Sequence, residues 1–220
     1  MKLGILGGTF DPIHHGHMII AQEAMINLGL DQVVFMPAGD PWMKQGQSIS
    51  AAQHRLTMTR LAVAEHPGFR ASAMEVRRPG PSYTIDTLRE LRQGPGADSR
   101  LHLLVGSDAY REMHKWREPD KISELCTLVV FSRPGGDSLE SPPASDEFCR
   151  LCNGSHHWFW RESPESDENL VHLQGPMIDI SGSEIRRRVA HGLPIRYQVP
   201  QTVEAYIASN NLYQSDQYPV

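Results

Sequence analysis

Apolar residues along the chain form short unbroken runs bounded by turn residues, with segments of helical period between them. Five such runs predict strands, at 3–6, 33–36, 101–105, 128–131 and 171–173. Unbroken apolar runs of this length are typical of strands buried on both faces of a parallel sheet. The alternation of strands and helices predicts an α/β fold, a doubly wound, Rossmann-like parallel sheet that binds ligands at the carboxyl ends of its strands.

One helix over the sheet is predicted from residue 51 onward, because Leu56, Thr59 and Val63 recur at helical spacing. Ser50 followed by Gln53 has the sequence of a capping box, which places the start of this helix.

The alternating pattern stops at 135–169, where Gly, Ser, Pro, Asp and Glu predict an insertion or long loop. Its aromatic cluster at 158–160 is interpreted as packing against protein rather than stacking on a ligand. Further helices are expected over 181–192 and 200–210, as a C-terminal helical region. We therefore expect a single domain over residues 1–220.

Composition limits the classes of partner. The 220 residues are 40% hydrophobic, enough for one sizeable α/β core. A formal net charge of −5 argues against nucleic acid or an anionic membrane, whereas a small anionic ligand needs only a few local cations. No apolar run approaches the length of a membrane span, so a cytoplasmic location is expected.

The three cysteines do not suggest a disulfide framework. Cys149 and Cys152 precede His156 and His157, but this spacing is much shorter than a zinc finger requires, and no second pair of cysteines exists. No metal-ligating residues are predicted.

The segment from Gly7 to His17 carries the strongest chemical signal. Gly7 and Gly8, directly after a strand, let backbone N–H groups approach a polyphosphate. His14 and His17 lie three residues apart at the start of a helix, on one side of its first turn, where the helix dipole favours an anion. This order of parts predicts a nucleotide-phosphate site.

The same segment, with its His-x-Gly-His pattern, resembles the signature of the adenylyltransferase branch of the nucleotidylyltransferase superfamily. Most of the chain continues the resemblance, which is to the nicotinate-nucleotide adenylyltransferases. It implies transfer of AMP from ATP to nicotinate mononucleotide, with release of pyrophosphate, in NAD synthesis. Mg²⁺ is implied as the companion of ATP, not by a cluster of ligands in the chain.

On the ATP side, Ile180 to Arg186 resembles the family's Ile-Ser-x-Thr/Ser-x-x-Arg motif. The resemblance implies that His14, His17 and Arg186 are catalytic. The residues implied to bind ATP are Gly7, Gly8, Thr9, Phe10, His17, Gly106, Ile180, Ser181, Ser183 and Arg186. Arg187 and Arg188 fall out of register with Arg186 on a helix and are interpreted as solvated or as weak electrostatic help.

On the acceptor side, Ser82 to Leu88 resembles the family's turn that receives the pyridine carboxylate, although Ser82 or Thr84 is also a candidate helix N-cap. Gly106-Ser107-Asp108 matches a Gly-x-Asp that binds ribose, and Trp116 matches a tryptophan that stacks on the pyridine ring. The residues implied to bind the nicotinate nucleotide are Lys44, Ser82, Tyr83, Thr84, Asp108, Trp116 and Arg117.

Two departures from the family pattern lie among the acceptor-binding residues, and the insertion before the Ile-Ser motif is a third. Pro41-Trp42-Met43-Lys44 stands where many relatives have Pro-Pro-His-Lys, and Arg117 stands where many have an aromatic residue. A nicotinamide-mononucleotide adenylyltransferase is an alternative because its acceptor differs only by a carboxamide in place of the carboxylate. A phosphopantetheine adenylyltransferase, which shares the opening motif, and a non-catalytic nucleotide sensor with the same fold are further alternatives. Homo-oligomerisation is also left open.

Overall fold

The structure is a computed structural model that describes residues 1–44, 46–94, 96–132, 159–160, 170–174 and 179–214. The predicted insertion at 135–169 lies outside the described residues except for a two-residue strand at 159–160. Cys149, Cys152 and Trp158 lie outside them too, so the hypotheses about these residues stay predictions.

The described strands form one sheet in the order β3-β2-β1-β4-β5-β7-β6. Their bounds are β1 Lys2–Gly8, β2 Gln32–Pro37, β3 Phe69–Ala71, β4 Arg100–Gly106, β5 Thr127–Ser132, β6 Phe159–Trp160 and β7 Leu170–Gln174. Neighbouring strands from β1 through β4 and β5 to β7 pair in parallel, and β6 pairs antiparallel to β7. The predicted doubly wound sheet and its five predicted strands are confirmed; β3 and β6 are additions.

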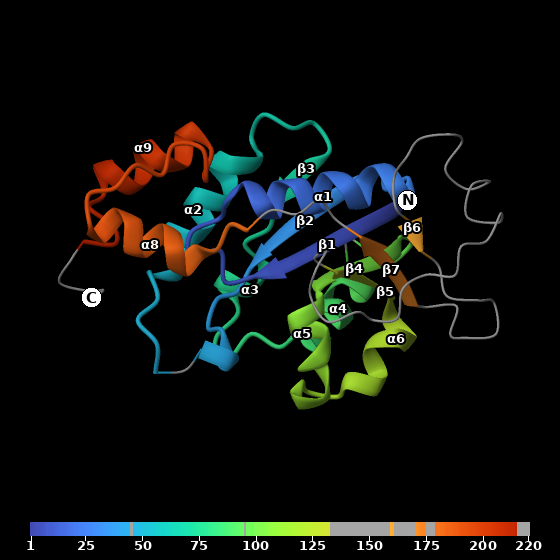
Figure 1. Cartoon of the computed structure of the whole chain (residues 1–220). Coiled ribbons are helices and arrows are strands. Elements are labelled where there is room, and N and C mark those ends of the chain that lie inside the picture. Colours follow the sequence, from blue (N-terminus) through green and yellow to red (C-terminus); the bar gives the residue numbers. More distant parts are fainter. Residues whose placement is uncertain (45, 95, 133–158, 161–169, 175–178, 215–220) are drawn as a thin grey trace. The chain divides into compact units, whose positions relative to one another are not determined.

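Helices lie in the connections from β1 to β2, β2 to β3, β3 to β4 and β4 to β5 (Figure 1). Their bounds are α1 His15–Leu28, α2 Ala52–Val63, α3 Met74–Arg77, α4 Thr84–Gln93, α5 Ser107–Arg111, α6 Ile122–Leu125, α8 Gly182–Ala190 and α9 Gln201–Ser209. Three short 3-10 helices are η1 Trp42–Lys44, η2 Met113–Lys115 and η3 Pro119–Lys121. In the described part of the chain, no helix is long and apolar enough to cross a membrane.

The chain divides into two compact units that interleave along the sequence. The first comprises Met1–Leu6, Ile20–Val33 and Thr84–Ile178, and the second comprises Gly7–Ile19, Val34–Tyr83 and Asp179–Val220. Each unit is described by itself below, and the expectation of a single domain over 1–220 stays a prediction.

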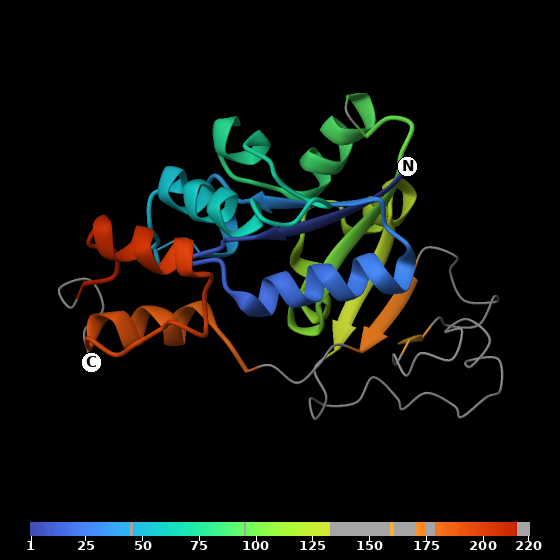
Figure 2. The same ribbon diagram turned by 90° about the horizontal axis from the view of Figure 1, so that it is seen from above.

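The first unit is built on β4, β5 and β7, which run side by side (Figure 2). The four consecutive residues from Leu128 to Phe131 are buried, as strands covered on both faces require. Gly4 of β1 packs closely against the loop after α1, since a Cβ there would lie 2.8 Å from Leu30 Cδ1 and this side chain would have to shift. Arg92 of α4 donates to the carbonyl of Leu125 at the end of α6, which ties these two helices together.

In the second unit, α2 presents the apolar face that the sequence predicts: Leu56, Thr59 and Val63 are buried. The predicted capping box is wrong. The N-cap is Ala51, no side chain bonds to the start of α2, and the N–H of Ser50 instead donates to Asp11 Oδ2 at 3.2 Å. A long-range contact has therefore taken the place of the local cap.

The two C-terminal helices also belong to the second unit and lie where the sequence predicts them. Ser181 caps α8, because its Oγ accepts the N–H of Glu184 at 3.2 Å. Pro200 is the N-cap of α9, whose Val203 and Ile207 are buried.

Candidate functional site

The segment after β1 folds back on itself. Phe10 has a left-handed backbone with φ of 50° and is only 2% exposed. Its ring meets the edge of His17, with ring centroids 4.9 Å apart. A Cβ at Gly8 would lie 2.9 Å from the Phe10 ring, so packing requires glycine there. Phe10 thus packs edge-on against the His17 ring.

His14 and His17 come together as predicted. Helix α1 begins at His15, and the two imidazoles stack with centroids 3.7 Å apart. The backbone N–H of His14 donates to His17 Nδ1 at 3.2 Å. That bond makes Nδ1 an acceptor and leaves the proton of the neutral ring on Nε2.

Burial is the largest of the influences that hold the pKa of His17 well below its ordinary value; the neighbouring His14 and Lys44 lower it further. His17 is therefore neutral near pH 7 when no anion is bound. A phosphate group would supply the opposite charge that raises its pKa.

Helix α8 brings Arg186 to the same segment. Arg186 Nη1 donates to the carbonyl oxygen of Asp11 at 2.6 Å, and Nη2 lies 3.4 Å from Ser183 Oγ. Gly182 allows this approach, since a Cβ there would lie 2.9 Å from the same carbonyl oxygen. The predicted pairing of Ser183 with Arg186 near the start of α8 is present.

The next two arginines, Arg187 and Arg188, have partners outside the segment after β1, as their register on the helix predicts. Arg187 is exposed and pairs with Glu184 at 2.7 Å. Arg188 donates to the carbonyl of Pro194 instead. Only Arg186 of the three is directed to the segment after β1.

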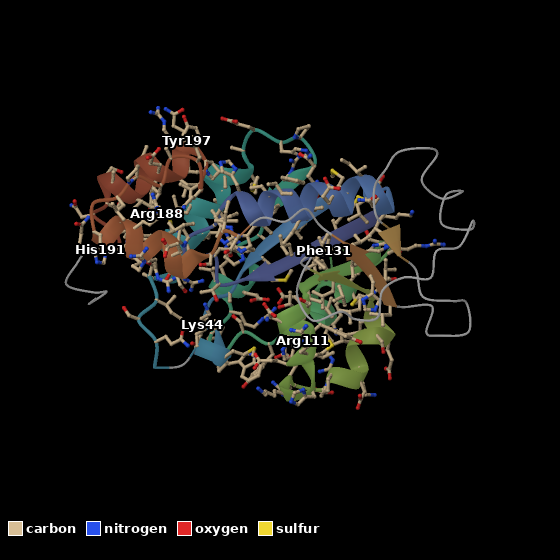
Figure 3. All side chains as sticks on the ribbon, viewed as in Figure 1. Lys44, Arg111, Phe131, Arg188, His191 and Tyr197 are labelled. Carbon is tan, nitrogen blue, oxygen red and sulfur yellow. The ribbon has the colours of Figure 1, made fainter. Side chains whose placement is uncertain are left out.

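Lys44, at the end of η1, adds a further cation to the second unit (Figure 3). Burial is the largest influence on its pKa and lowers it; Arg186 lowers it further, whereas Asp11 opposes the shift. We call His14, His17, Lys44 and Arg186 the cation cluster. An anion bound beside His17 and Lys44 would oppose the lowering of their two pKa values.

Asp11 and Arg55 are buried polar residues that the sequence analysis passed over. The carboxylate of Asp11 accepts from Tyr213 Oη at 2.7 Å and from the N–H of Ser50. Arg55 is 1% exposed, and its guanidinium donates to four carbonyl oxygens, those of Thr9, Ala38, Gly39 and Ser50. The sequence did contain a signal that Arg55 is buried, because Arg55 lies four residues before Thr59 and therefore on the same buried face of α2.

Ser82 has a different structural role from either one suggested by the sequence. Its Oγ accepts from the N–H groups of Gly39 at 2.9 Å and Asp40 at 3.3 Å. The next residue, Tyr83, packs against Trp42, with ring centroids 5.9 Å apart. Ser82 and Tyr83 thereby hold the segment that leads to Lys44.

The first unit contains the remaining residues implied to bind the acceptor. Thr84 is the first residue of α4, so the predicted loop-to-helix turn is confirmed. Gly106 is the N-cap of α5, and the Asp108 side chain is 79% exposed in its first turn. Trp116 follows η2, and its Nε1 is buried with no hydrogen-bond partner among the described residues.

Arg117, the residue that departs from the family pattern, has an acidic partner in the same unit. Its Nη1 lies 3.3 Å from Asp86 Oδ2, in the first turn of α4. Arg89 lies 3.9 Å from the same carboxylate. The charge of Asp86 is thus countered at the helix end where an anionic ligand is expected.

Within the described residues, no group of three or more His, Cys, Asp and Glu side chains is placed to hold a metal ion. Both oxygens of the Asp11 carboxylate already accept hydrogen bonds. The polar groups of the cation cluster are suited to phosphate rather than to a metal ion.

A glycine-bounded segment after the first strand of a doubly wound sheet, followed by stacked histidines, defines a nucleotidyltransferase. The Cytidylyltransferase-like family model matches residues 5–188. Two relatives, from Roseiflexus sp. (strain RS-1) and Thermomicrobium roseum, are both named "Probable nicotinate-nucleotide adenylyltransferase". The Roseiflexus protein is 43% identical, and the match covers 96% of this chain and 97% of that protein. The Thermomicrobium protein is also 43% identical, and the match covers 97% of this chain and 92% of that protein. The chain belongs to the nicotinate-nucleotide adenylyltransferase family.

A solved structure has the same fold. The Plasmodium falciparum nicotinic acid mononucleotide adenylyltransferase complexed with NaAD superposes with a TM-score of 0.71 over 96% of this chain and 97% of that chain. Its sequence identity of 17% limits this likeness to the fold. Nucleotidyltransferases of this kind generally use a divalent metal ion with ATP.

Proposed function

We propose that this enzyme transfers the adenylyl group of ATP to nicotinate mononucleotide, giving nicotinate adenine dinucleotide and pyrophosphate. The observation that carries the proposal is the cation cluster: His14 and His17 stack in the segment after β1, Arg186 donates to Asp11 of that segment, and Lys44 influences the pKa of His17. Membership of the family supports the choice of substrates.

The reaction requires positioning and charge stabilisation. A phosphate oxygen of the mononucleotide attacks the α-phosphorus of ATP, and the bond from that phosphorus to the pyrophosphate oxygen breaks. We assign His14, His17 and Arg186 to stabilise the transferring group. His17, neutral in the free enzyme, gains positive charge as the polyphosphate raises its pKa.

Other residues are assigned to hold ATP. Backbone N–H groups near Gly8 and the hydroxyls of Ser181 and Ser183 are the proposed neutral donors to phosphate. The proposed ATP-binding set also includes Gly7, Thr9, Phe10, Gly106 and Ile180. Because the side chain of Phe10 is buried, its contribution would be limited to its backbone.

The residues proposed to bind the acceptor are matched to its chemical groups. The N-terminus of α4 at Thr84 suits the pyridine carboxylate, Asp108 suits ribose hydroxyls, and Trp116 suits the pyridine ring. Lys44, Tyr83 and Arg117 complete the proposed set. Ser82 is included through its backbone, because its hydroxyl already accepts two N–H groups.

Mg²⁺ is the proposed metal and would arrive with ATP. A magnesium ion at such sites is held largely by phosphate oxygens and water, and it supplies charge neutralisation on the polyphosphate. The cation cluster complements that role by binding phosphate oxygens directly. A cytoplasmic location and any homo-oligomer stay predictions.

The test is pyrophosphate release from ATP and Mg²⁺ with one acceptor at a time, compared as kcat/KM. Nicotinate mononucleotide is expected to be strongly preferred over nicotinamide mononucleotide and phosphopantetheine. Preference for the amide would overturn the assignment of the acceptor. No release with any of the three would favour a nucleotide sensor.

A further inference from the structure

The C-terminal turn after α9 places one aromatic side chain entirely inside the second unit. Tyr213 is 0% exposed, and its hydroxyl donates to Asp11 Oδ1 at 2.7 Å across 202 positions of sequence. Its backbone is left-handed, with φ of 63°, and Asn211 is left-handed too, with φ of 48°. Residues other than glycine disfavour this conformation and keep it only where surrounding contacts hold it.

Asp11 is the point where this turn meets the cation cluster. Its carboxylate is held on one oxygen by Tyr213 and on the other by the N–H of Ser50. Its backbone carbonyl accepts the 2.6 Å hydrogen bond from Arg186 Nη1. It stands three residues before His14 in the chain. One residue therefore connects the C-terminal turn, the start of α2, the arginine of α8 and the histidine segment.

We infer that Tyr213 is a positioning residue for the phosphate-binding segment, acting through Asp11 on Arg186. With the hydroxyl in place, the Asp11 carboxylate has one orientation, and its carbonyl presents a fixed acceptor to the guanidinium. Without the hydroxyl, one carboxylate oxygen is left buried without that donor, so Asp11 shifts toward water and the carbonyl moves with it. Arg186 then loses the partner that directs it.

This inference rests on the proposed function for the nature of the ligand, and its test is separate from turnover. The variant is Tyr213→Phe, which deletes only the hydroxyl and keeps the buried ring. The matched control is Tyr206→Phe on α9, whose hydroxyl lies 2.9 Å from His54 Nδ1 and, among the described residues, makes no hydrogen bond to Asp11 or Arg186.

The primary measurement is the Kd of ATP with Mg²⁺ by calorimetry, at a temperature where circular dichroism shows both variants fully folded. Tyr213→Phe is expected to weaken ATP binding about tenfold, and Tyr206→Phe less than twofold. In steady-state assays, Tyr213→Phe should lower kcat/KM for ATP while the KM for the acceptor changes less than twofold.

A stabilising role alone would lower the melting temperature and leave the ATP affinity of the folded protein unchanged; that result would overturn the inference. A double-mutant cycle checks the route: in an Asp11→Ala background, Tyr213→Phe should add no further loss of ATP affinity. Additive losses would show that Tyr213 acts by another path. If wild-type enzyme binds ATP but releases no pyrophosphate, the proposed function fails while the affinity test still decides the role of Tyr213.

Discussion

Replacing Arg55 by methionine tests how the second unit holds its loops. The guanidinium donates to the carbonyl oxygens of Ser50 at 2.9 Å, Thr9 at 2.8 Å, Ala38 at 2.6 Å and Gly39 at 2.9 Å. Hydrogen bonds from a charged donor contribute about 1.5 to 3 kcal/mol each, so the four amount to roughly 6 to 12 kcal/mol before any cost is subtracted.

The cost is the desolvation of a guanidinium that is 1% exposed. Burial is the largest influence on the pKa of Arg55 and lowers it, and Asp11 is the strongest opposing influence. Desolvation offsets several kcal/mol of the gross gain. We therefore expect Arg55→Met to lower the free energy of unfolding by about 3 to 5 kcal/mol, mainly through the carbonyl groups left without a donor.

The assay is urea unfolding followed by circular dichroism, analysed with a common slope. Arg60→Met on the same helix is the control, because Arg60 is exposed; it should change stability by less than about 0.5 kcal/mol. A loss below 1 kcal/mol for Arg55→Met would refute the reasoning, since it would mean that water satisfies the four carbonyls equally well.

Three further predictions concern His17 in the second unit and Arg117 in the first. His17→Ala should lower kcat by a factor of 100 or more while the protein stays folded, because it removes a group that we propose stabilises the transferring phosphoryl; single-turnover kinetics would check it, and near-normal turnover would contradict the role. The depressed pKa of His17 makes stability fall as pH drops below its ordinary value of 6.5, because the unfolded chain then binds a proton that the folded enzyme does not. Urea unfolding from pH 7.5 to 5 should show this slope, and His17→Gln should make it shallower by up to one proton; an equal slope in both proteins would count against a neutral His17. Arg117→Met should lower the preference for the acid over the amide acceptor about two- to fivefold, because it exposes the charge of Asp86 at the start of α4; an unchanged kcat/KM ratio would exclude that role.

The sequence predicted what depends on local pattern. Unbroken apolar runs located five strands, and the spacing of His14 and His17 predicted their shared side of a helix turn. Each of these two patterns is formed by residues close together in the sequence, so it can be recognised without knowing the rest of the chain.

The features that could not be predicted from the sequence are hydrogen bonds between residues far apart in the chain. Ser50 has the pattern of a cap, but its N–H is used by Asp11, 39 positions earlier. Ser82 reaches 43 positions back to Gly39, and Tyr213 reaches Asp11 across 202. No local propensity encodes such pairs, because each is decided by which loops the sheet brings together.

The left-handed backbone at Phe10 was missed for a related reason. Its sequence position between glycine and proline residues suggested a phosphate-binding loop, whereas the Phe10 ring is buried and packs edge-on against His17. The glycine at 8 is thus required by side-chain packing as well as by any ligand.

The central claim is the acceptor of the adenylyl group, and a competition experiment tests it most directly. The enzyme would be given ATP labelled at the α-phosphate, Mg²⁺, and equal concentrations of nicotinate and nicotinamide mononucleotides in one vessel. The ratio of labelled dinucleotides formed early in the reaction equals the ratio of kcat/KM values. The account predicts that the label enters nicotinate adenine dinucleotide in large excess. Equal labelling of the two products, or an excess in the amide product, would contradict it.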